Sequence, residues 1–186
     1  MARSRVLAGT ALFAAMTLVL NESIKIPAPY ASFLTYEVWE IPIVVALLIF
    51  GAGASVGVAL VNFVALQLIY PGQLAMGPLY NLSAILLMLF GIWVASGITE
   101  GRRIRTTVAT ATGIGVLSRV VGMTLLSDVL MPLPPPVGFA ISPSLLLGFL
   151  VLIAVFNASV ALYTIPFAFW LARAARQRSG KSPALH

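Results

Sequence analysis

Residues 109–131 read ATATGIGVLSRVVGMTLLSDVLM, a stretch of small and apolar residues with one cation, Arg119, near its middle. The stretch exceeds the ~20 residues that a helix needs to cross a bilayer. A cation at the centre of a membrane helix costs about 2.5–3.5 kcal/mol on insertion scales, so a chain keeps one only where something pairs with it. The stretch therefore predicts a membrane helix with a polar partner or a ligand at its middle.

The composition of the whole chain indicates the same class of protein. Of the 186 residues, 60% are hydrophobic and 9% are charged, which is more apolar surface than a soluble domain of this length needs. The apolar runs are continuous rather than alternating, which disfavours a transmembrane β-barrel. We therefore expect one all-α integral membrane domain over residues 1–186.

The hydrophobic runs predict six transmembrane helices. Their expected ranges are 6–20, 40–51, 55–70, 79–98, 104–131 and 145–172, with 144–153 interpreted as a separate short helix on the outer surface. Three connections, at 21–39, 71–78 and 132–143, are rich in proline, which cannot continue a helix. We expect these connections to form the outer loops.

The distribution of basic residues predicts the orientation in the cell membrane. With six spans, nine of the eleven basic residues fall on one side: Arg3, Arg5, Arg102, Arg103, Arg105, Arg173, Arg176, Arg178 and Lys181. Cytoplasmic loops carry the excess of Lys and Arg, so both termini are predicted to be cytoplasmic. The basic residues are split among three segments without interleaved aromatic residues, which argues against nucleic-acid binding.

Polar residues inside the predicted spans gather in the outer half of the bundle. They are Asn62, Gln67, Tyr80, Asn81, Arg119, Asp128 and Asn157. Convergent polar groups in an apolar bundle indicate a small-molecule pocket that is accessible from outside. The alternative is that the amides only join helices, through hydrogen bonds of about 0.6 kcal/mol each.

Three carboxylates are available to Arg119, and helix geometry separates them. Asp128 lies nine residues further along the same predicted helix, so at about 100° per residue it faces the opposite side. Glu37, Glu40 or a ligand anion is therefore the favoured partner.

Several kinds of chemistry are disfavoured by missing residues. The chain has no cysteine, and its one histidine is His186, the last residue, so we expect no metal, no cofactor and no catalytic centre. No phosphate-binding loop for ATP and no internal repeat is evident. The chain is predicted to bind a solute from outside without powering its movement.

Small residues in the first predicted span form Ala11-x-x-x-Ala15. Such spacing lets a second helix approach closely. Packing within the chain and packing against a partner are both compatible with this pattern.

Several short patterns point to one family. They are Ala11-x-x-x-Ala15, Lys25-Ile-Pro-Ala-Pro29, Tyr36-Glu37, Ile41-Pro42, Gly77-Pro78-x-x-Asn81, Arg119-x-x-x-Met123-Thr124, Met131-Pro132-Leu133 and Phe156-Asn157 before Tyr163. Together they resemble the substrate-binding S component of energy-coupling factor (ECF) vitamin transporters, most closely the riboflavin type. The family commonly has a lysine a few residues after the asparagine, and residues 158–163 contain none. A related vitamin or another small metabolite is therefore an open alternative to riboflavin.

The resemblance implies a role for each group of residues. Hydrogen bonds to the solute are expected from Asn81, Asn157, Arg119 and Glu37, with Asn62 and Gln67 in the same pocket. Tyr36, Trp39 and Tyr80 are expected to stack on a planar ring, and residues 21–39 to act as a lid. The face of Ala11 and Ala15 is expected to dock on a transmembrane T component, whose two partner ATPases supply energy. The alternatives are a stand-alone facilitator or ion-coupled carrier, and a membrane scaffold subunit that does not transport.

Overall fold

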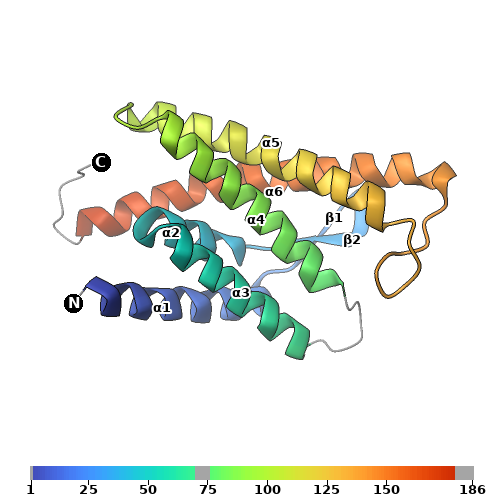
Figure 1. Ribbon diagram of the computed structural model, residues 1–186, viewed down its shortest axis with the longest axis horizontal. Coiled ribbons are helices and arrows are strands. Elements are labelled where there is room, and N and C mark those ends of the chain that lie inside the picture. Colours follow the sequence, from blue (N-terminus) through green and yellow to red (C-terminus); the bar gives the residue numbers. More distant parts are fainter. Residues whose placement is uncertain (1, 70–75, 179–186) are drawn as a thin grey trace.

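The structure is a computed structural model that describes residues 2–69 and 76–178. Its described residues form six helices and one two-stranded sheet (Figure 1). In chain order the elements are α1 (Ala2–Ser23), β1 (Ile26–Ala28), β2 (Ala31–Tyr36), α2 (Glu40–Phe50), α3 (Ala52–Ile69), α4 (Gly77–Ile98), α5 (Ile104–Leu130) and α6 (Pro143–Arg178). The predicted boundaries differ from these by a few residues at most ends; residue 70, the predicted end of the third span, and Lys181 lie outside the described part.

Five of these helices are long and apolar enough to cross a membrane, and α2 is not. The 11 residues of α2 extend about 16 Å at 1.5 Å per residue, roughly half of the ~30 Å hydrocarbon core. The prediction that residues 40–51 form a full transmembrane helix is therefore wrong. The hydrophobic run is real, but it packs inside the protein instead of crossing the bilayer as one helix.

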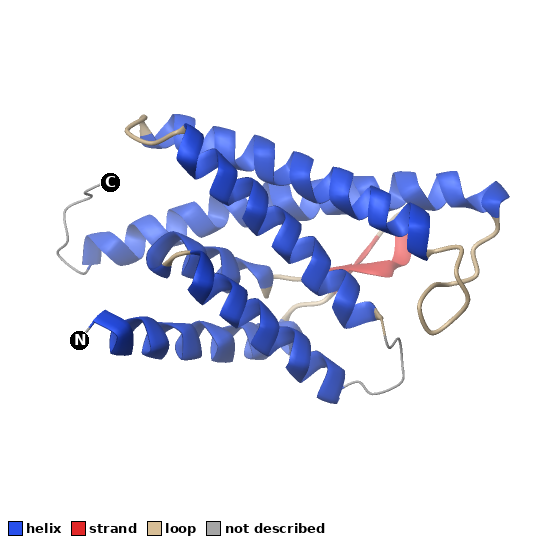
Figure 2. Cartoon of the chain, viewed as in Figure 1, coloured by secondary structure: helices blue, strands red, loops and turns tan. Residues whose placement is uncertain are grey.

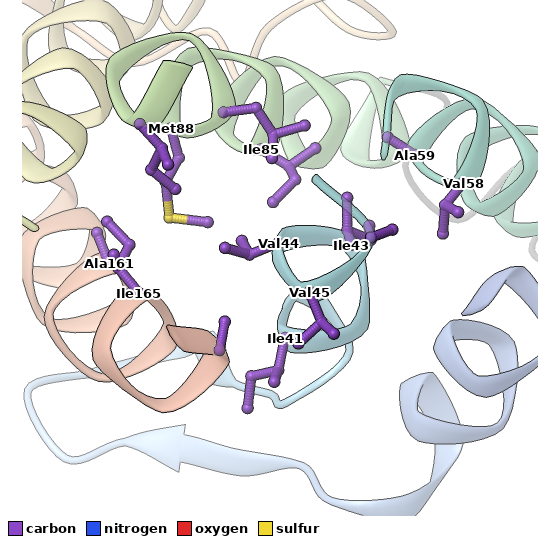
Figure 3. Packing of buried hydrophobic residues seen from close by; sticks show 14 of the residues in the cluster. Ile41, Ile43, Val44, Val45, Val58, Ala59, Ile85, Met88, Ala161 and Ile165 are labelled. Atoms are coloured by element: carbon purple, nitrogen blue, oxygen red, sulfur yellow. The ribbon is translucent and has the colours of Figure 1, made fainter. Parts of the chain in front are cut away.

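The short helix α2 forms the centre of the core. Residues 40–46 of α2 are all buried, as expected for a helix that is apolar on every side. Figure 3 shows Ile43 and Val44 of α2 directed toward a shell of side chains that includes Ile85 and Met88 of α4. Residues of α3 and α6, among them Val58 and Ile165, complete this shell. The core therefore forms around the one helix that is too short to span a bilayer.

A β-hairpin lies within residues 21–39, the loop that was predicted to act as a lid (Figure 2). Strands β1 and β2 pair antiparallel, with Ile26 opposite Tyr36 and Pro27 opposite Thr35. Hydrophobic periodicity did not indicate these strands, because β1 is three residues long and contains a proline. The hairpin leads directly into α2, and β2 contacts α6.

Helix α6 is continuous from Pro143 to Arg178. The prediction of a separate short helix over residues 144–153 is therefore wrong. Proline at the first helical position is favourable, because its missing N–H would have no partner there and its backbone angle suits the helix. The proline-rich segment before it thus ends where the long helix begins.

Helices α4 and α5 approach closely at glycine. A Cβ atom on Gly91 would lie 2.7 Å from the carbonyl oxygen of Ile114 and 2.8 Å from the Cα of Gly115. One turn away, the Ser118 hydroxyl donates a 2.7 Å hydrogen bond to the Leu87 carbonyl. Small residues allow this backbone approach, which positions the middle of α5 against α4.

The first residues of α1 and the last turns of α6 lie at the same end of the bundle, as does the α4–α5 connection (Figure 1). Of the nine basic residues that were predicted to share one side, seven arginines are described with their side chains, and they belong to these three segments. The clustering of positive charge at one end therefore holds in three dimensions.

We predict that Gly91→Ala destabilises the protein and that Gly97→Ala does not. Overpacking costs about 1–3 kcal/mol, and the added methyl would meet backbone atoms that cannot rotate away. A Cβ on Gly97, in the same helix, meets nothing within 4 Å, so this variant gains helix propensity without a clash. Thermal unfolding in detergent measures both; equal unfolding temperatures would contradict the close approach of α4 and α5.

Candidate functional site

Arg119 lies on the buried face of α5. The buried residues of this helix recur every fourth position: Ala111, Gly115, Arg119, Met123 and Ser127. Gly115 faces α6, since a Cβ there would lie 2.6 Å from Ile165 Cδ1. A glycine one turn before the arginine thus lets α5 and α6 come together and directs the guanidinium into the bundle. Arg119 is only 2% exposed.

The partner of Arg119 is Glu40, the first residue of α2. The guanidinium binds the carboxylate with two nitrogens: Nη2 donates to Oε1 at 2.8 Å, and Nη1 donates to Oε2. Glu40 is 5% exposed, so the ion pair is removed from solvent on both sides. Bidentate geometry is the strongest form of this interaction. The expectation that Glu37 or Glu40, and not Asp128, pairs with Arg119 is confirmed, and Asp128 is exposed.

Helices α4 and α6 also contact the ion pair. The Arg119 Nε donates a 2.8 Å hydrogen bond to Asn157 Oδ1 on α6, and Nη1 lies 3.7 Å from the Met88 sulfur on α4. Asn157 Nδ2 in turn donates to the Ile153 carbonyl at 2.9 Å. Four helices therefore meet at one guanidinium.

These contacts do not use every donor. A guanidinium carries five N–H groups and an amide nitrogen carries two. The contacts above account for four on Arg119 and one on Asn157. Among the residues that the structure describes, one Nη2–H of Arg119 and one Nδ2–H of Asn157 have no acceptor.

An aromatic cluster connects the hairpin to α6. Tyr36 packs on Phe156 with ring centroids 5.1 Å apart and on Tyr163 at 6.4 Å. Its hydroxyl lies 2.7 Å from the Ser159 hydroxyl and 2.6 Å from that of Tyr30. Desolvation, together with the hydrogen bond to Tyr36, raises the pKa of the Tyr30 hydroxyl.

The residues between the hairpin and α2 are held tightly. Trp39 Nε1 donates to Glu37 Oε2 at 2.6 Å, and the Tyr163 hydroxyl donates to the Glu37 carbonyl at 2.5 Å. Tyr36 therefore lies in the aromatic cluster, and Glu40, four residues later, lies in the ion pair. The predicted site residues Tyr36, Glu37 and Trp39 are all part of this connection.

Three buried hydroxyls have no hydrogen-bond partner among the described residues: those of Tyr80, Thr124 and Thr164. Leaving a buried donor unsatisfied costs about 1–3 kcal/mol. Tyr80 packs against Phe139, with ring centroids 6.2 Å apart, near the end of the bundle opposite the arginine-rich segments. These groups have hydrogen-bonding capacity for a polar ligand or for water.

Other predicted site residues lie apart from the ion pair. Asn62 of α3 accepts a hydrogen bond from Asn21 of α1, so this amide joins two helices. Gln67 is partly buried further along α3, and Asn81 is exposed near the start of α4. Ala11 and Ala15 are both exposed on α1, whereas Ala14 is buried.

Sequence reasoning missed Met88 and Ser159, and it included Thr124 in a family pattern without giving it a role in the site. Phe156, Ser159 and Tyr163 are spaced at i, i+3 and i+7, which places them on one face of a helix. This periodicity is visible in the sequence and identifies Ser159 once Phe156 and Tyr163 are considered. Met88 and Thr124 carry no comparable signal.

The fold matches that of a known class of transporter subunit. A solved structure described as "Structure and mechanism of the S component of a bacterial ECF transporter" superposes with a TM-score of 0.68 at 20% sequence identity, covering 96% of each chain. No family model and no curated protein sequence matches the chain. The chain therefore has the ECF S component fold, as the sequence patterns predicted.

We predict strong energetic coupling between Arg119 and Glu40. Arg119→Met or Glu40→Met alone leaves a buried charge without a partner, which lowers the free energy of unfolding by about 3–5 kcal/mol. The double variant is expected to lower it by less than the sum of the two single losses. Chemical unfolding in detergent of the wild type, the two single variants and the double variant measures this coupling. Asp128→Met is the matched control, because Asp128 is exposed and its loss leaves the ion pair intact. If the double variant lost as much unfolding free energy as the Arg119 and Glu40 variants together, the pairing would be contradicted.

Proposed function

We propose that the chain is the solute-binding S component of an ECF-type importer in the cell membrane. The observation that carries this proposal is the fold match over 96% of both chains. Further support comes from the buried Arg119–Glu40 pair beneath an aromatic hairpin, because ionisable groups inside membrane proteins mark functional sites by default. The solute is captured from outside, and a T component with two ATPases drives its uptake.

In this proposal the chain crosses the membrane six times with both termini in the cytoplasm. Five crossings are the long helices, and the remaining one combines β2 with α2. Six extended residues add about 20 Å to the ~16 Å of α2, enough for the hydrocarbon core. The backbone of β2 is paired with β1 along one edge, and its last three residues are partly buried, which makes a non-helical segment tolerable. The arginine-rich end faces the cytoplasm by the positive-inside rule.

The proposed solute site lies between the hairpin and the ends of α4, α5 and α6 that are away from the arginine-rich end of the bundle. Its hydrogen-bonding groups are the unused N–H groups of Arg119 and Asn157 and the unsatisfied hydroxyls of Tyr80 and Thr124. Asn81 and Glu37 are proposed contacts at its rim. Asn62, which pairs with Asn21, and Gln67 contribute through the packing of α1 and α3.

The aromatic content of the site favours a planar solute. Tyr36 and Tyr80, each packed against a second ring, offer faces for stacking, and Trp39 fixes the adjacent backbone. A solute with an aromatic ring and polar edges matches these groups. A vitamin or related metabolite has this chemistry, and riboflavin is the first compound to test.

We predict that Asn157→Ala weakens solute binding about 10- to 100-fold, because a hydrogen bond to a buried polar group is worth about 1–3 kcal/mol. The measurement is titration of the purified protein with riboflavin, then with a panel of other vitamins, followed by fluorescence or calorimetry. Asn21→Ala is the matched control, because it removes an equally buried amide at the α1–α3 contact. Equal affinities for wild type and Asn157→Ala would overturn the placement of the site.

We predict that the double variant Ala11→Trp/Ala15→Trp abolishes ATP-driven uptake and leaves solute affinity unchanged. Both alanines are exposed on α1, and two indoles would block the close approach of a partner helix. The matched control is Leu117→Trp/Leu125→Trp, which enlarges two exposed residues of α5 instead.

Uptake is measured in cells that carry the chain with a T component and ATPases, and again without them. Uptake by the chain alone would favour a stand-alone facilitator or an ion-coupled carrier. Normal uptake by the alanine double variant would place the docking face elsewhere.

A further inference from the structure

A groove between α5 and α6 lies at the arginine-rich end of the bundle, away from the proposed solute site. Its volume is about 640 Å³. Apolar residues, including Ile104, Val108 and Ala109, form most of its lining, and Arg105 and Arg173 line it as well. Neither the ion pair nor the aromatic cluster extends into it.

Small side chains and a proline keep the groove from being filled. Gly113 lies one turn beyond Ala109, and a Cβ atom built on it would meet nothing within 4 Å. Pro166 of α6 also lines the groove, and its ring has no N–H to donate within the helix. The groove is therefore a space between two helices that the chain's own side chains leave empty.

Two cations without a counter-ion line this space. Arg105 is the second residue of α5, and Arg173 lies near the end of α6. Both are exposed, and neither forms an ion pair or a side-chain hydrogen bond with the described residues. An anion is the complementary ligand for a guanidinium pair, and phosphate suits its geometry.

The depth of the groove favours an amphiphile. From Arg105 to Gly113 the helix rises about 12 Å, close to half of the ~30 Å hydrocarbon core. With the orientation proposed above, the arginines lie at the membrane surface, and the apolar lining runs into one leaflet. Apart from the ion pair of Arg119 with Glu40, helix α5 packs mainly on α4 and α6, so it is at the edge of the bundle, where lipid has access (Figure 1).

We propose that this groove binds an anionic phospholipid of the cytoplasmic leaflet. The phosphate lies between Arg105 and Arg173, and an acyl chain follows Val108, Ala109 and Gly113 toward Pro166. Basic pockets between membrane helices on the cytoplasmic side bind anionic head groups in this manner. A soluble anion would satisfy the arginines but would leave the apolar part of the groove unused.

The test is native mass spectrometry of the delipidated full chain with equal amounts of dioleoyl phosphatidylglycerol and dioleoyl phosphatidylcholine. Wild type is expected to retain one phosphatidylglycerol in preference to phosphatidylcholine. Each arginine near an anionic lipid contributes about fivefold, so Arg105→Gln/Arg173→Gln is expected to lower that preference about 25-fold. Gly113→Leu, which fills the groove without changing charge, is expected to lower phosphatidylglycerol occupancy as well.

The matched control is Arg3→Gln/Arg5→Gln, which removes two exposed arginines from α1 at the same end of the bundle. It is expected to bind lipid as wild type does. The proposal is overturned if this control loses as much lipid as the groove variant, or if Arg105→Gln/Arg173→Gln keeps the wild-type preference. Displacement of the lipid by millimolar inorganic phosphate would show that the site takes the anion alone and would also overturn it.

Discussion

The buried ion pair between Arg119 and Glu40 is the interaction on which the rest of the structure depends. Removing two charges from water is unfavourable, and only good geometry and further hydrogen bonds offset that cost. Here the carboxylate is bidentate, and the Arg119 Nε donates a further hydrogen bond to Asn157. Because Glu40 begins α2, Arg119 lies in α5 and Asn157 in α6, satisfying this charge fixes the relative positions of three helices. It also explains why so short a helix as α2 lies at the centre of the core.

The same pair connects the hairpin to the interior of the helix bundle. Tyr36 ends β2 and packs on Phe156, and Glu40 follows four residues later. Between them the Glu37 carbonyl accepts a hydrogen bond from Tyr163, and its carboxylate accepts one from Trp39. A solute that binds against the hairpin therefore contacts a segment whose other end is the charge pair. Solute binding at the hairpin and packing in the middle of the bundle therefore both involve residues 36–40.

The sequence predicted the parts of this structure that follow from single residues and strong periodicity. The cost of a cation in a membrane helix identified Arg119, and the 100° step between residues excluded Asp128 as its partner. The ranges of the five long helices followed from continuous apolar runs. The ECF S component fold followed from short local patterns and is supported by the structural match.

Other features depend on tertiary contacts that no local pattern encodes. The run over residues 40–50 looks like a transmembrane helix by hydropathy, yet it is only 11 residues long and its first seven residues are buried by their neighbours. The strands of the hairpin are too short, and too interrupted by proline, for alternation to be visible. Asn62 and Asn157 are equally plausible as pocket residues in the sequence, but the structure pairs the first with Asn21 and the second with Arg119.

The most direct test of the account is whether the purified protein carries a solute. Mass spectrometry of the chain, expressed in cells and purified without added ligand, is expected to show one small planar molecule bound in a one-to-one ratio. That molecule, added back to stripped protein, is expected to raise its unfolding temperature. If no molecule co-purifies and no vitamin in a broad panel raises the unfolding temperature, the chain is not a solute-binding subunit and the central claim is wrong.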